Sequence, residues 1–67
     1  MNRRYRFITG DRKILKDFSM PEKVLPEIND MVRVNGEDYS IIRIKTDYDY
    51  DNNEIIHKIY LQHSYTL

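Results

Sequence analysis

The chain has 67 residues, no cysteine and equal numbers of acidic and basic side chains, so it is expected to form one small domain, residues 1–67. Without cysteine, disulfides and thiolate zinc sites are excluded, and His57 and His63 are too few to hold a structural zinc. The sequence contains no long apolar run and no secretory signal pattern, so we expect a cytoplasmic protein.

The first predicted strands cover residues 3–9 and 12–18, where apolar and polar side chains alternate on either side of Gly10-Asp11. A two-residue turn at Gly10-Asp11 would place Phe7 opposite Ile14. The inward face of this hairpin would then carry four side chains: Tyr5, Phe7, Ile14 and Phe18.

The next segment breaks regular structure because it contains Pro21 and Pro26. Pro21 suits the first position of a single helical turn over residues 22–25. Two further strands, residues 31–35 and 38–49, flank Asn35-Gly36, a pair that favours a type I′ hairpin turn because both residues accept positive φ.

The long strand 38–49 is expected to bend, because Ile41 and Ile42 are adjacent and cannot both point inward. A bulge would place Tyr39 and Ile41 on one face of the strand and Ile42 and Ile44 on the other. In the last predicted strand, residues 54–62, apolar side chains again occupy alternate positions. One face carries Ile55, Ile59 and Leu61, and the opposite face carries Ile56 and Tyr60.

Five short strands in one small domain predict an all-β fold, a small five-stranded antiparallel barrel or curled sheet. We expect an SH3-like barrel, with an OB-like barrel or an open meander as the alternative.

One part of the chain resembles a family. The segment LPEINDMVRVNGEDYSIIRI contains a proline, an Asn-Asp pair, an Asn-Gly turn and a Tyr-x-Ile motif. This pattern resembles one found in small β-barrel-like proteins of bacteria and their phages, whose role is unassigned. Asn29 stands where glycine is more usual, and asparagine tolerates the left-handed conformation of such a turn. The resemblance covers under a third of the chain and implies a fold more than a function. It rests on seven residues: Pro26, Asn29, Asp30, Val32, Gly36, Tyr39 and Ile41.

The segment TDYDYDNNEI alternates aspartate with tyrosine, and it is the first candidate site. Asp47, Asp49 and Asp51 have the spacing of the first ligands of an EF-hand calcium loop. That loop needs glycine where Asn52 stands and glutamate where Lys58 stands, so no metal is expected. The segment is predicted to end a strand and to offer an acidic surface to a protein partner. The residues assigned to this protein-binding site are Asp47, Tyr48, Asp49, Tyr50, Asp51 and Tyr60.

Charge is unevenly distributed along the chain. Residues 1–23 contain seven basic and three acidic side chains, whereas residues 24–67 contain four basic and eight acidic ones. A separation of this kind favours contact with charged partners or with a second copy of the chain. The basic residues near the start of the chain form the alternative site, for nucleic acid: Arg3, Arg4, Arg6, Arg12, Lys13 and Lys16.

No catalytic residues are identified. His57 and His63 are six residues apart in one predicted strand, about 20 Å when extended. The sequence has no glycine-rich phosphate loop and no nucleophile motif. We therefore expect no cofactor and no enzymatic activity.

The function expected from these observations is that of a non-catalytic protein-interaction module, with a partner of unknown identity. Taken with the resemblance, it would be an accessory or inhibitory protein of a phage or mobile element. The alternative is a small nucleic-acid-binding barrel that uses the basic N-terminal face. A homodimer is also considered, because apolar side chains at Ile41 and Ile42 occupy both faces of one strand.

Overall fold

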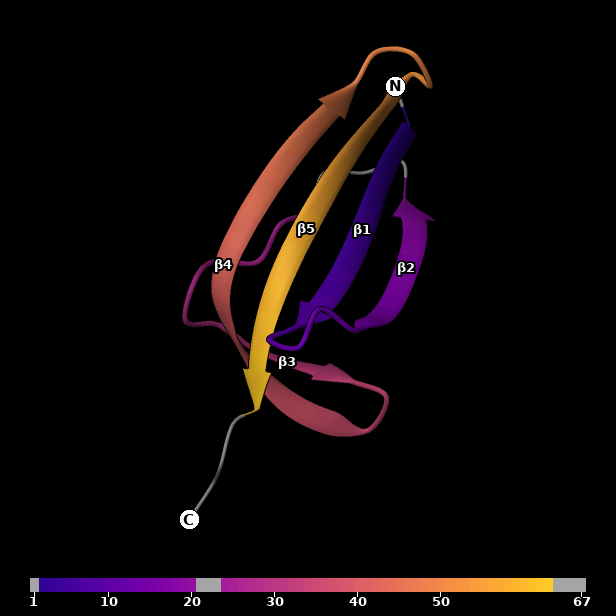
Figure 1. Ribbon diagram of the computed structural model, residues 1–67. Helices are drawn as coiled ribbons and strands as arrows, with labels where there is room; N and C mark the ends of the chain where they lie inside the picture. The colour runs from indigo at the N-terminus through magenta and orange to yellow at the C-terminus, as the bar shows by residue number, and fades with distance from the viewer. Residues whose placement is uncertain (1, 21–23, 64–67) are drawn as a thin grey trace.

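Five β-strands account for all the regular structure in residues 2–20 and 24–63, the parts of the chain that the computed structural model describes. The strands are β1 (Asn2–Thr9), β2 (Ile14–Met20), β3 (Met31–Val34), β4 (Glu37–Asp49) and β5 (Glu54–His63). They form one strongly curled sheet, a nearly closed barrel, which confirms the predicted fold class (Figure 1). Within the described ranges there is no helix suited to crossing a membrane.

The strand order is β2-β1-β5-β4-β3, which places β5 in the centre of the sheet. β1 and β5 run parallel, while the other three neighbouring pairs are antiparallel. The sheet is therefore mixed and not purely antiparallel as expected. No hairpin turn joins β1 to β5, so the relative direction of these two strands is not set by local turn chemistry. At the open seam, the Asn35 Nδ2 atom donates a hydrogen bond to the Leu15 carbonyl oxygen at 3.3 Å.

The β1–β2 turn is longer than the predicted two-residue turn. The Arg12 amide donates to the Thr9 carbonyl at 2.9 Å, and the Thr9 amide donates to the Lys13 carbonyl at 2.9 Å. Arg12 has a φ of 66°, so the loop is a turn closed by a left-handed residue. A non-glycine residue in this conformation carries no obvious sequence signal, and the predicted register was wrong for that reason.

The observed register places Tyr5 opposite Phe18 and Ile8 opposite Ile14. The Tyr5 and Phe18 rings stack inside the barrel with centroids 5.5 Å apart. Ile14 is 52% exposed and does not face inward, contrary to the sequence prediction. It lies across from Ile8 on the outer side of the sheet, where both side chains line a surface cleft.

The β3–β4 hairpin has the predicted type I′ geometry and register. Asn35 and Gly36 have φ values of 53° and 81°. Arg33 lies opposite Asp38, and their side chains form an exposed ion pair at 3.0 Å. In the preceding loop Asn29 takes the expected left-handed conformation, with a φ of 78°. Of the helical turn expected over residues 22–25, residues 22–23 lie outside the described residues, and residues 24–25 form no helix.

β4 contains the predicted bulge, but its consequence differs from the prediction. The β4–β5 register shifts between Ile41, which pairs with Leu61, and Arg43, which pairs with Tyr60. Ile42 is the extra residue and is 48% exposed. The bulge returns Ile44 to the core side, where it packs against the buried cluster, so Ile44 does not share the face of Ile42 as expected.

The core fills the inside of the curled sheet. On β5, the side chains of Ile55, His57, Ile59 and Leu61 are buried and alternate with less buried ones, as the pattern of that strand predicts. Six buried side chains form the central cluster: Tyr5, Val34, Tyr39, Ile41, Ile59 and Leu61.

Candidate functional site

The outer face of the sheet brings three cations together across the three central strands. Arg6 of β1 lies opposite Lys58 of β5, and Lys58 lies opposite Lys45 of β4. We call this set (Arg6, Lys58 and Lys45) the cationic row. Like charges directly opposite one another destabilise a sheet, so the row costs folding free energy unless anions neutralise it.

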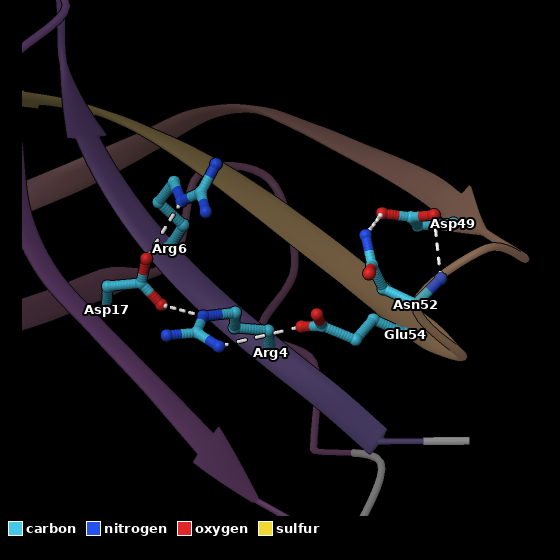
Figure 2. Close-up of polar contacts among 6 residues, drawn as sticks. All are labelled: Arg4, Arg6, Asp17, Asp49, Asn52 and Glu54. Carbon is cyan, nitrogen blue, oxygen red and sulfur yellow. Dashed lines mark hydrogen bonds and ion pairs between the residues drawn. The ribbon is translucent and has the colours of Figure 1, made fainter.

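Two aspartates of the chain partly neutralise the outer face. Asp17 accepts hydrogen bonds from Arg4 Nε at 2.7 Å and from Arg6 Nε at 3.0 Å, and Arg4 also approaches Glu54 at 3.5 Å (Figure 2). Burial alone would raise the pKa of Asp17, but the two arginines outweigh it and hold that pKa below its usual value.

Asp47 neutralises the row from the side of β4. Its carboxylate lies 2.8 Å from Lys58 Nζ, and this hydrogen bond, with the nearby charge of Lys45, lowers the pKa of Asp47. Both neutralising aspartates are therefore ionised at neutral pH.

A cleft of about 470 Å³ lies beside the cationic row. We call it the outer cleft. Its apolar lining comes from Ile8, Ile14, Ile42 and Tyr60. Arg43 lies over the Tyr60 ring, with its guanidinium carbon 5.7 Å from the ring centroid. The basic side chains that line the cleft are Arg6, Arg12, Arg43 and Lys58.

The structure divides the basic residues that the sequence grouped as a nucleic-acid site. Arg4 and Arg6 lie on the outer face and are bonded to Asp17, while Arg12 lies in the β1–β2 turn. Arg3 and Lys16 belong to the other face. There, Arg3 contacts His57, and the Lys16 ammonium lies 5.8 Å from the centroid of the Phe18 ring. Lys13 also lies in the turn, so the six residues do not form one surface.

His57 is buried between Arg3 and Thr46. The Arg3 Nη1 atom lies 3.2 Å from His57 Nε2, and Thr46 Oγ1 lies 3.1 Å from Nδ1. Since arginine can only donate, Nε2 accepts, and the proton is assigned to Nδ1, which donates to Thr46. His57 is thus a neutral imidazole that links β1, β4 and β5. His63 lies six residues further along β5, with its ring against Tyr39, so the structure does not bring the two histidines together.

The acidic segment forms the end of the β4–β5 hairpin. We call residues 49–53 the acidic tip. Asp49 organises it by accepting a hydrogen bond from the Asp51 amide at 3.1 Å. It also accepts one from the Asn52 side chain at 2.8 Å (Figure 2). The bonds from Asn52 also lower the pKa of Asp49. The described residues contain no group of three or more side chains placed to hold a metal ion.

The six residues proposed for protein binding fall into two places. Tyr48 and Tyr50 are 61% and 80% exposed, near or in the acidic tip. Tyr60 instead lines the outer cleft. Because Tyr48 pairs with Ile55, five positions before Tyr60, the two tyrosines are about 16 Å apart along the strand direction.

Sequence reasoning missed Arg43, Lys45 and Lys58 as functional candidates. These residues join the outer face only through the β4–β5 register and the parallel β1–β5 pairing. No protein-family model, no curated protein and no solved structure matches this chain.

Replacing Asp17 tests how far the outer face depends on its internal anions. We expect Asp17→Asn to lower the free energy of unfolding at neutral pH by about 1 kcal/mol, because two charge-assisted hydrogen bonds are weakened. The depressed pKa means that this stabilisation is present above the ordinary aspartate value, about 4, and is lost as pH falls through the folded-state pKa. Urea denaturation at a series of pH values measures both effects.

The control for this experiment is Asp38→Asn, which breaks the more exposed Arg33–Asp38 pair. It should lower the free energy of unfolding by less than Asp17→Asn does. The curves of the wild type and Asp17→Asn should converge in acid. A difference that persists unchanged below the folded-state pKa would contradict the charge-based explanation.

Proposed function

We propose that the chain is a non-catalytic protein-interaction module that docks an acidic segment of a partner on its outer cleft. The observation that carries the proposal is the composition of that cleft, in which apolar side chains lie between basic ones. Ile14 and Ile42, which contribute to it, are about half exposed. A partner segment with an aliphatic or aromatic side chain between two carboxylates fits this arrangement chemically.

The cleft also has the composition of a protein interface. Arginine and aromatic residues are enriched at interface centres, and the burial of apolar side chains there stabilises the complex. Arg43 and Tyr60 form such a pair, and the cationic row adjoins them. The cations would steer an acidic segment toward the surface, and the isoleucines would hold it.

A fluorescent peptide that alternates glutamate and leucine is the probe for this proposal. We expect it to bind the wild-type chain, with an affinity that falls as salt rises. Ile42→Asp should weaken binding by roughly tenfold or more, because it places a carboxylate in the apolar part of the cleft. Fluorescence anisotropy measures the affinity, and circular dichroism checks that the variant folds, as expected for a half-exposed bulge residue.

The matched control is Ile28→Asp, because Ile28 is 55% exposed and does not line the outer cleft. This variant should bind the peptide as the wild type does. A peptide that alternates lysine and leucine should not bind either chain. Equal binding by the Ile42→Asp and Ile28→Asp variants would contradict the proposed site.

Nucleic acid is the second candidate ligand, and the cationic row is the observation in its favour. Binding to duplex DNA would weaken with salt. The logarithm of the binding constant would fall linearly with the logarithm of the salt concentration, with a slope of about 0.9 for each phosphate contacted. The apolar lining favours a protein instead, because bases stack on aromatic rings, whereas three of the four apolar side chains that line the outer cleft are isoleucines and one, Tyr60, is aromatic. A mobility shift that Lys45→Ala and Arg43→Ala abolish would favour nucleic acid.

Three finer expectations from the sequence stay predictions: the SH3-like assignment, the cytoplasmic location, and the role as an accessory or inhibitory protein of a phage or mobile element. A binding module with a small all-β fold is compatible with each of them.

A further inference from the structure

We propose that the outer cleft of one copy takes the acidic tip of a second copy, in a two-fold dimer that competes with the protein partner for the same cleft. The inference rests on the proposed function of the outer cleft and adds the identity of one occupant. It also implies regulation, since self-association at high concentration would withhold the cleft from the partner.

The acidic tip has the chemistry that the outer cleft requires. Tyr50 is 80% exposed and stands between Asp49 and Asp51. A large ring flanked by carboxylates complements a cleft in which isoleucines lie among basic side chains. Tyrosine is also one of the residues that contribute most at protein interfaces.

A chain cannot place its acidic tip in its own cleft. Arg43, which lines the cleft, and Tyr50, in the tip, are seven residues apart, or about 23 Å along an extended strand. The β4–β5 ladder spans this stretch from Arg43–Tyr60 to Asp49–Glu54 and prevents the strand from folding back. The tip must therefore come from another copy.

The same spacing allows the acidic tip of each of two copies to reach the outer cleft of the other. The β4–β5 turn, which carries the tip, and the β1–β2 turn lie at opposite ends of the sheet (Figure 1). The cleft lies near the β1–β2 turn, because Thr9, Gly10 and Arg12 are among its lining residues. If two copies lie antiparallel, each tip meets the other copy's cleft. Such a reciprocal contact closes at two chains and leaves no cleft open.

A charge-exchange experiment tests this arrangement directly. Arg43→Glu removes a cation from the cleft and leaves the tip intact, whereas Asp51→Arg reverses a tip charge and leaves the cleft intact. We expect sedimentation to give a dimer for the wild type at high micromolar concentration and low salt, and a single chain for each variant alone. An equal mixture of the two variants should again give the dimer, because both reciprocal contacts then join opposite charges.

The matched control is Asp38→Arg, which makes the same charge change on the β3–β4 hairpin, away from the tip. This variant should dimerise as the wild type does. Raising the salt to about 1 M should shift the wild type toward single chains, because it screens charges beyond about 3 Å.

The glutamate–leucine peptide separates this inference from the proposed function. The Asp51→Arg chain keeps an open cleft, so it should bind the peptide several-fold more tightly than the wild type at concentrations where the wild type dimerises. If that chain fails to bind the peptide while the charge exchange still restores the dimer, the proposed function is wrong and the dimer stands.

Three results would overturn the dimer. One is a wild-type mass of a single chain at high micromolar concentration and low salt. Another is a mixture of the two variants that stays monomeric. The third is a series of species larger than two chains, which would show an open head-to-tail contact instead of two-fold closure.

Discussion

Ile59→Ala is expected to cost about 2–5 kcal/mol and to leave the chain largely unfolded at room temperature. Ile59 has no exposed surface and lies on the central strand β5, between Phe7 of β1 and Ile44 of β4. A single core of this size supplies about 3–5 kcal/mol of net stability, so one deleted side chain removes most of it. Circular dichroism combined with urea titration measures the loss.

Ile42→Ala is the matched control, since it removes the same atoms from a half-exposed bulge residue. It should change stability by about 0.5 kcal/mol or less. If the Ile59→Ala chain unfolded cooperatively at nearly the wild-type urea concentration, β5 would not be the centre of the core.

His57→Ala is expected to be nearly as destabilising, at about 2–4 kcal/mol. The substitution leaves a cavity beside the Tyr5 ring, whose centroid is 5.0 Å from that of the imidazole. It also removes the acceptor for Arg3 and the donor to Thr46. Urea unfolding measures the difference in stability, and His63→Ala is the control because the side chain of His63 is about half exposed.

His57→Phe separates the two contributions to this loss. Phenylalanine fills the space of the ring but makes no hydrogen bond to Arg3 or Thr46. If these bonds matter, the phenylalanine variant should recover only part of the lost stability. Full recovery would mean that His57 acts through its volume alone, and the assigned proton on Nδ1 would have no structural consequence.

Local sequence signals were sufficient for the β3–β4 hairpin and for the bulge in β4, but not for the β1–β2 hairpin. Asn35-Gly36 predicted the β3–β4 register because asparagine and glycine accept the positive φ that a type I′ turn requires. Adjacent Ile41 and Ile42 likewise predicted a bulge in β4. The prediction of the β1–β2 turn was wrong because Gly10 suggested a tight two-residue turn, whereas Arg12 takes the left-handed conformation.

The candidate surface could not be predicted in the same way. It depends on the parallel pairing of β1 with β5, which places Arg6 beside Lys58 although they are far apart in sequence. A pairing between strands that no hairpin joins leaves no turn residue to identify it. The sequence therefore revealed the basic residues near the start of the chain but could not show that Arg43 and Lys45 complete the same surface.

The parallel pairing of β1 with β5 also has a consequence for how the chain folds. Asn2 pairs with Glu54 and Thr9 with Leu61, so the central ladder joins segments separated by 52 residues. Contacts of such high sequence separation slow folding, because the loop between them must lose its entropy before the contacts form. During synthesis, β1 to β4 emerge before β5, the strand that joins the β1–β2 pair to the β3–β4 pair. Until β5 is made, β1 and β4 each keep an unpaired edge, and the nascent chain depends on its charged side chains to avoid pairing with its neighbours.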